Sequence, residues 1–221
     1  MGKVLPLAII VILAASVVIS AGLCALLLLT LPGLRLLPKA RRVTLEGITT
    51  IDDAVVACRR TGLSGWPLAA YAQQLAARKF SYSRRNPWDS PDRAFERGLG
   101  YCQQQALALK RIYAGLGLKA QPVYAFRCRF PPAVIDGMPE PERLSPHTWL
   151  QVRIGGEVRD VCCGSTSNTP GVVHFEVLSE VKPLAPWLRS FSHLGSVIEN
   201  VKRDRRACRR AQRKQTITDR I

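Results

Sequence analysis

The sequence has no C-x-x-C element, although it contains seven cysteines. Zinc centres and thiol–disulfide redox sites commonly use that spacing, so the usual signature of both is missing. An odd number of cysteines leaves at least one thiol unpaired, and free thiols are typical of reducing compartments. The chain also lacks a calcium-binding loop and a phosphate-binding motif. We therefore expect neither a metal ion nor a cofactor.

Acidic residues are scarce, with 16 Asp and Glu against 32 Lys and Arg and a formal net charge of +16. This excess of positive charge favours anionic partners such as lipid headgroups, nucleic acid or an acidic protein. Residues 201–214 carry eight basic side chains and one acid, Asp204. We expect the C-terminal tail, residues 201–221, to be solvated or to contact anionic lipid. Nucleic acid is not the expected partner, because no aromatic side chains are interleaved with the basic ones to stack on bases.

Charged residues are absent from residues 4–34. This apolar run exceeds the roughly 20 residues that a helix needs to cross a bilayer, and a signal peptide has a shorter apolar stretch of about 7–15 residues. We therefore predict a membrane anchor over residues 1–34, which makes the chain a single-pass membrane protein; a cleaved signal peptide is the alternative. The basic residues that follow are Arg35, Lys39, Arg41 and Arg42. By the positive-inside rule, the domain after them lies in the cytoplasm.

The remaining chain consists of predicted helices followed by predicted strands, which indicates an α+β fold. Residues 35–65 form a basic segment beside the membrane and a short helix, with Thr50 as its cap and Asp53 three positions later. Residues 66–200 form one domain. Within it we expect helices over residues 66–80, from Cys102 and from Trp187, and strands over residues 120–130, 147–154, 157–163 and 171–178. Residues 81–93 and 131–143 contain several prolines and are predicted to be loops.

Cys102 follows a glycine-rich turn, Gly98 to Gly100, and stands at the first turn of a predicted helix. The inward stripe of this helix consists of Cys102, Ala106, Leu109, Tyr113 and Leu116. One interpretation of Cys102 is an ordinary buried thiol in a core helix. The other is a nucleophile, because a helix N-terminus lowers the pKa of a thiol and offers backbone N–H groups to an oxyanion.

A cysteine nucleophile needs a base, and the chain has only three histidines. His147 opens a predicted strand directly after a loop, and the next strand, beyond the turn dipeptide Gly155-Gly156, carries Asp160 on the same face of the sheet. His174 has no evident partner, and His193 lies off the apolar stripe of the last helix. An alternative is a metal site made of Cys128, Cys162, Cys163 and His174. Adjacent cysteines seldom both bind one metal, which argues against that alternative.

Together these features resemble the transglutaminase-like superfamily. The resemblance depends on the glycine-rich turn, the cysteine that opens a helix, the run GLKAQPVYAF, His-Thr-Trp on one strand and Asp on the next, and it spans about residues 71–164. The stretch DVCCG is also similar to the Asp-Val-x-x-G stretch of arylamine acetyltransferases. The resemblance implies a papain-like core in which the helix bearing the cysteine packs on an antiparallel sheet. It also implies a triad with Cys102 as nucleophile, His147 as general base and then acid, and Asp160 as the orienting group.

The spacing between His147 and Asp160 is short for such a triad. With the two-residue glycine turn, Asp160 lies opposite Gln151, four residues from His147, which is roughly 13 Å at ~3.3 Å per residue. A wider turn or a bulge would shorten this distance. Otherwise Asp160 is not the third member, and Asn168 is a substitute for it. In the simple register, Cys162 lies nearer to His147.

The sequence therefore predicts a membrane-anchored cysteine enzyme of transglutaminase-like type. It acts on an amide or acyl bond of a protein or peptide through a cysteinyl thioester. Water as the acceptor makes it a peptidase or amidase, which we prefer slightly, and an amine makes it a transglutaminase. A different class of function is a non-catalytic scaffold of the same fold that binds a peptide at the membrane. A third is an adaptor whose basic tail binds anionic lipid or nucleic acid.

Overall fold

The computed structural model describes residues 7–36, 45–84, 87–135, 138–185 and 188. The chain divides into two compact units, one of residues 1–39 and 197–221 and one of residues 40–196. In the first unit, helix α1 (Leu7–Leu36) is described, and most of its described side chains are exposed. Within the described part of the chain, no helix is both long enough and apolar enough to cross a bilayer. The anchor over residues 1–34 stays a prediction, and the basic tail and most of the predicted last helix lie outside the described residues.

Four described helices of the second unit supply side chains to the hydrophobic core on one face of the sheet. They are α2 (Ile51–Arg60), α3 (Gly65–Lys79), α4 (Pro91–Arg97) and α5 (Cys102–Gly115). The start of α2 confirms the predicted cap: the Thr50 hydroxyl accepts a hydrogen bond from the Asp53 N–H at 3.1 Å, and the Thr50 N–H donates to the Asp53 carboxylate at 2.7 Å. This reciprocal pair satisfies two of the N–H groups that a helix start leaves without partners.

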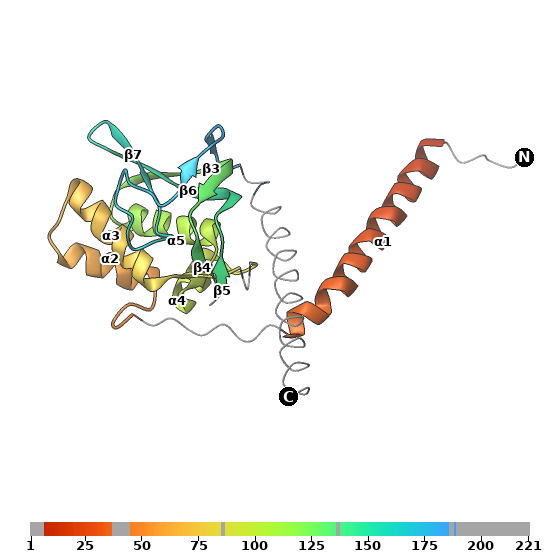
Figure 1. The fold of residues 1–221 in the computed structure, drawn as a ribbon, viewed down its shortest axis with the longest axis horizontal. Coiled ribbons are helices and arrows are strands. Elements are labelled where there is room, and N and C mark those ends of the chain that lie inside the picture. The colour runs from red at the N-terminus through yellow and green to blue at the C-terminus, as the bar shows by residue number, and fades with distance from the viewer. Residues whose placement is uncertain (1–6, 37–44, 85–86, 136–137, 186–187, 189–221) are drawn as a thin grey trace, which may run out of the picture. The chain divides into compact units, whose positions relative to one another are not determined.

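An antiparallel sheet forms the other layer of the second unit (Figure 1). Its strands are β3 (Lys119–Phe130), β6 (Arg143–Ile154), β7 (Glu157–Val161), β8 (Glu176–Val177) and β9 (Lys182–Pro183). The order is β7-β6-β3-β8, and β9 also pairs with β3. Gly155 and Gly156 connect β6 to β7 with φ of 57° and 86°, the left-handed conformation that a tight hairpin turn requires. The predicted register is confirmed, because Asp160 pairs with Gln151. The structure thus confirms a mixed helix-and-sheet fold.

Two segments predicted to be loops contain regular structure, so those predictions were wrong. Residues 81–93 include β1 (Ser81–Tyr82) and the first residues of α4, where Ser90 caps the helix and proline occupies its first position. Residues 131–143 include the short hairpin of β4 (Ala133–Ile135) and β5 (Met138–Glu140). The strand predicted over residues 171–178 is reduced to β8, because the preceding residues turn back on themselves at Thr169 and Val172.

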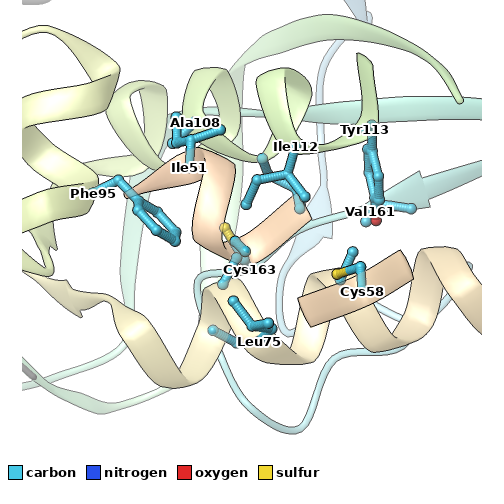
Figure 2. Close-up of a cluster of buried hydrophobic side chains, with 14 of the residues drawn as sticks. Ile51, Cys58, Leu75, Phe95, Ala108, Ile112, Tyr113, Val161 and Cys163 are labelled. Carbon is cyan, nitrogen blue, oxygen red and sulfur yellow. The ribbon is translucent and has the colours of Figure 1, made fainter. Parts of the chain in front are cut away.

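One face of the sheet packs against the helices (Figure 1). Figure 2 shows buried side chains that converge there from all four helices and from the end of β7. We call this set the helix-side cluster; its members include Ile51, Cys58, Leu75, Phe95, Ala108, Leu109, Ile112, Tyr113, Leu150, Val152, Val161 and Cys163. Alternate residues of β6 supply it, since Leu150 and Val152 point to the same face. The helix that begins with Cys102 is therefore held firmly against the sheet.

Candidate active site

The start of α5 is fixed by a short parallel pairing. Strand β2 (Leu99–Gly100) pairs with β1, with Tyr82 opposite Gly100. A side chain at Gly100 would be crowded, because a Cβ there would lie 3.2 Å from the Gln104 Cβ and 3.3 Å from the Phe80 ring. The chain thus enters the helix in close contact with β1 and Phe80, which places Cys102 at the first helical position.

Three consecutive glutamines follow Cys102, and all three are buried. The Gln103 side chain accepts a hydrogen bond from the Tyr101 hydroxyl at 2.7 Å. The Gln104 side chain accepts from the Tyr101 N–H at 3.3 Å and donates to the Asp89 carbonyl at 3.0 Å. The Gln105 side chain donates to the Gly100 carbonyl at 3.0 Å. These amides tie the helix start to the residues around it, although Gln103 and Gln104 lie off the predicted apolar stripe.

Cys102 as a residue is half-buried, and its sulfur lies in protein surroundings beside the backbone of β6. Burial raises the pKa of the Cys102 thiol; the backbone N–H of Thr148, the Arg84 guanidinium, the N–H of Gln103 and the Arg143 guanidinium act in the opposite direction. We expected the helix start to lower this pKa, and the direction is the reverse. Burial shifts a pKa by up to several units, whereas a helix end contributes about 0.3–1 kcal/mol, so burial dominates. Cys102 is therefore a neutral thiol at neutral pH.

Side chains alternate between the two faces of β6, and His147 points to the face opposite Leu150 and Val152, away from the helix-side cluster. Its ring is 6% exposed and packs among aromatic rings, with centroid distances of 4.5 Å to Phe175 and 5.0 Å to Phe130. We call this set the aromatic cluster; it consists of Phe130, His147, Trp149, His174 and Phe175. Burial holds the pKa of His147 well below its usual range, and His174 and Arg143 lower it further. The imidazole is therefore neutral at neutral pH, and its surroundings disfavour the protonated form.

The His147 ring contacts Cys162, as the simple register predicted. The His147 Nε2 and the Cys162 Sγ are 3.5 Å apart. Cys162 is buried, and burial raises the pKa of its thiol to about 12, although the Gly164 N–H donates to the sulfur at 3.4 Å. Cys162 is thus a protonated thiol with little access to a substrate.

Asp160 accepts a hydrogen bond from Trp149, a member of the aromatic cluster. The Trp149 indole N–H donates to the Asp160 carboxylate at 2.8 Å. The Trp149 ring in turn lies nearly parallel to the His147 ring, with an angle of 13° and a centroid distance of 6.0 Å. Among the described residues, no hydrogen bond joins His147 to Asp160 or to Cys102. The roles of Cys102, His147 and Asp160 as a triad stay a prediction.

A second histidine, His174, is linked to Cys162 through Asn168, and the sequence pattern did not indicate Asn168 as a partner of His174. The Asn168 side-chain amide donates to the Cys162 carbonyl at 2.8 Å, and its second hydrogen lies toward the His174 Nδ1 at 2.9 Å. Gln73, from α3, donates to the same carbonyl at 3.0 Å. With Nδ1 as an acceptor, His174 carries its proton on Nε2. The signal was hidden because Asn168 and His174 both belong to irregular chain, where periodicity says nothing.

No metal centre is formed by the residues that the structure describes, since no three His, Cys, Asp or Glu side chains converge suitably among them. The four residues of the alternative metal site, Cys128, Cys162, Cys163 and His174, do not all lie on the same face of the sheet. Cys163 belongs to the helix-side cluster, whereas Cys128 and Cys162 pack with the aromatic cluster on the other face.

Comparisons with solved structures show a weak likeness. No known protein family matches the sequence, and no curated protein matches it. A solved structure described as the crystal structure of a TGase is similar to this chain, with a TM-score of 0.38 and 16% sequence identity. The match covers 51% of this chain and 30% of that chain.

Proposed function

We propose that the chain is a cysteine enzyme of transglutaminase-like type that acts on an amide or acyl bond of a protein or peptide. The observation that supports this most is the position of Cys102. It opens α5, the residue is half-buried, and its sulfur meets the N–H of Thr148, the residue directly after His147. A thiol at a helix start, next to the strand that carries a neutral imidazole, has both elements of nucleophilic catalysis.

The protonation states favour general-base catalysis over a preformed ion pair. Cys102 is a thiol and His147 a neutral imidazole, so His147 takes the thiol proton as the sulfur attacks the carbonyl carbon. Collapse of the tetrahedral intermediate breaks the bond to the leaving group, which receives that proton from His147, and a thioester remains on Cys102. The acceptor, water or an amine, then gives a proton to His147 as it attacks the thioester, and His147 passes that proton to the departing Cys102 sulfur, which restores the thiol. This course requires the His147 ring to turn from Cys162 toward Cys102.

The proposal is tested by acylation with p-nitrophenyl acetate, an activated ester. We expect one acetyl group on the tryptic peptide of residues 98–110, which contains Cys102 and no other cysteine. The Cys102→Ala variant should lose the adduct, and the Cys162→Ala variant should keep it. An acetyl group found instead on Cys162, and lost in Cys162→Ala but kept in Cys102→Ala, would assign the nucleophile to the cysteine that contacts His147 and overturn the proposal.

The same experiment separates hydrolysis from amine transfer. In a hydrolase, release of p-nitrophenol continues at the same rate when methylamine is added. In a transferase, methylamine accelerates the second step and N-methylacetamide accumulates. We prefer the hydrolase.

A non-catalytic scaffold is the second candidate, and one observation favours it. The Asp160 carboxylate is bonded to Trp149 and not to His147, so the orienting group of a triad is engaged elsewhere. A folded chain that forms no acetyl adduct on Cys102 would support the scaffold over the enzyme.

We also propose that the protein is a single-pass membrane protein with its domain in the cytoplasm. The support comes from the uncharged run of residues 4–34 and from the exposed apolar side chains of α1, such as Ile12, Val18 and Leu23. Carbonate extraction of membranes from cells that express the full chain tests this. Retention in the membrane pellet, lost when residues 1–34 are deleted, is the expected result; release of the full chain would contradict it.

A further inference from the structure

We infer that the acyl donor of Cys102 carries an apolar group on the acyl side of the reacting carbonyl, and that Phe126, Leu144 and Pro146 bind this group. The inference rests on the proposed function, since it names the class of substrate that the same thiol takes. It is carried by exposed apolar side chains on the helix-side face of the sheet, in the part of that face that lies beyond the start of α5.

The start of α5 is level with the middle of β3. Helix α5 packs on the sheet, and only residues 116–118 join its end to β3, so β3 runs back along the helix. The Leu118 N–H donates to the Tyr113 carbonyl at 2.8 Å and keeps this connection tight. The 14 residues of α5 rise about 21 Å at ~1.5 Å per residue. Strand β3 covers that length in about six residues at ~3.3 Å per residue, which places Cys102 level with Tyr124.

The exposure of the helix-side face changes at this level. Tyr124 pairs with Thr148 across β3 and β6, and each is 8% exposed. On the side that α5 covers, Leu150 is 0% exposed. On the other side, Phe126 and Leu144 are each 55% exposed. The face thus loses its cover where α5 begins, and it presents large apolar side chains next to the helix end that bears the thiol.

Strand alternation and a ring contact place these side chains on one face. Leu144 and Pro146 precede Thr148 by even numbers of residues, so they point to the same side of β6. Phe126 lies in the bulge of β3 opposite Pro146, and its ring packs edge-to-face against the Tyr124 ring, with a centroid distance of 5.0 Å and an angle of 83°. We call Phe126, Leu144 and the exposed Pro146 the sheet patch.

The chemistry of the sheet patch favours an apolar group. Arg129 lies opposite Leu144, but its guanidinium pairs with Glu176 at 2.8 Å, so its charge is compensated. Contiguous exposed apolar side chains mark binding surfaces, and burial of one methylene favours binding about fourfold. Phe126 is two residues from Tyr124, roughly 7 Å along the strand. This continuity with the position of the thiol assigns the sheet patch to the acyl group of the substrate.

The test compares p-nitrophenyl hexanoate with p-nitrophenyl acetate, which share a leaving group and differ only in the length of the acyl chain. We measure the acylation rate of Cys102 with each ester in the full chain, by mass spectrometry of the peptide of residues 98–110. The hexanoate-to-acetate ratio is divided by the same ratio for N-acetylcysteinamide, which corrects for intrinsic reactivity. An enrichment of about tenfold is expected, which corresponds to burial of about two methylenes of the hexanoyl chain.

Variants locate the effect. Phe126→Ala should remove most of the enrichment, and Leu144→Ala should remove less, because Leu144 lies farther along its strand from the Tyr124–Thr148 pair. Phe126→Leu keeps an apolar surface and should retain most of the enrichment. Leu63→Ala is the matched control, because Leu63 is 42% exposed in the connection between α2 and α3; it should leave the ratio unchanged. Circular dichroism confirms that each variant is folded.

The outcomes separate the two proposals. A wild-type ratio equal to that of N-acetylcysteinamide, with Cys102 acylated by both esters, would overturn the apolar subsite and leave the proposed function standing. An enrichment that survives in the folded double variant Phe126→Ala, Leu144→Ala would also overturn the subsite. A smaller size of that variant in size-exclusion chromatography would then assign the sheet patch to contact between two copies. If neither ester acylates Cys102 in the folded chain, the proposed function and the subsite fail together.

Discussion

The two faces of the sheet carry different kinds of core. The helix-side cluster is mostly aliphatic, with Phe95 and Tyr113 as aromatic members (Figure 2). The aromatic cluster on the other face surrounds two histidines and neighbours two thiols, Cys128 and Cys162. Burial of apolar side chains stabilises the helix-side cluster. In the aromatic cluster, burial also disfavours the charged forms of His147 and His174. The sheet thus separates a mainly structural core on one face from the buried histidines on the other, and the Cys102 sulfur lies beside the Thr148 N–H of β6.

The largest expected effect is on the helix-side cluster. Ile112 is 0% exposed, and Ile112→Ala leaves a cavity between α5 and the sheet. We expect the free energy of unfolding to fall by about 3 kcal/mol in chemical denaturation. Val56→Ala, at an exposed position on α2, is the control and should cost less than about 0.5 kcal/mol. Equal losses in the two variants would contradict the described packing.

A smaller effect is expected at Asp160, and it separates two roles. Asp160→Ala leaves the buried Trp149 N–H without its acceptor and should lower the free energy of unfolding by about 2 kcal/mol. Asp160→Asn still offers an oxygen to the indole and should recover most of that loss. If Asp160 acts by holding Trp149, Asp160→Asn also keeps the acylation rate of Cys102. A loss of acylation with normal stability in Asp160→Asn would instead identify Asp160 as the orienting group of His147.

The aromatic cluster should make stability depend on pH. The pKa of His147 is far lower in the folded state than its unfolded value of about 6.5. Below pH ~6.5 the unfolded chain binds a proton that the folded chain does not. The free energy of unfolding should therefore fall by about 1.4 kcal/mol per pH unit as the pH decreases below that value. His174 acts in the same direction. His147→Gln should flatten the profile between pH ~5 and ~7 in thermal melts; an unchanged slope would contradict the neutral buried imidazole.

The smallest expected effect is at the cap of α2. Thr50→Ala removes the hydroxyl that accepts from the Asp53 N–H and should cost about 1 kcal/mol. Thr49→Ala is the matched control, because Thr49 contributes its backbone N–H to Asp53 and its side chain is exposed. Urea denaturation of both variants compares them directly. Equal stability of the two variants would show that the cap contributes nothing.

Local signals account for what the sequence could predict. Thr50 and Asp53 indicate a capping box. The Gly155-Gly156 dipeptide predicts the hairpin and the register of Asp160. The apolar stripe from Cys102 predicts α5. Each depends on residues a few positions apart. The proximity of Cys162 to His147 followed from that register by counting residues.

Long-range packing decided the rest. The pKa of Cys102 depends mainly on how deeply its thiol is buried, and the position of a residue at a helix start does not reveal that burial. The aromatic cluster brings Phe130, His147 and Phe175 together from three distant segments. The Asn168–His174 hydrogen bond lies in irregular chain. The hydrogen bond that the Trp149 indole donates to the Asp160 carboxylate competes with the orienting role that a triad assigns to that carboxylate.

The central claim is that His147 removes the proton of Cys102 as its sulfur attacks. The most direct measurement is the rate of acetylation of Cys102 by p-nitrophenyl acetate near neutral pH in the His147→Ala variant. We expect a rate about 100-fold below that of the wild type. The Cys162→Ala variant, which removes the thiol that His147 contacts, should stay close to the wild type. Equal rates in the wild type and in a folded His147→Ala variant would contradict the central claim.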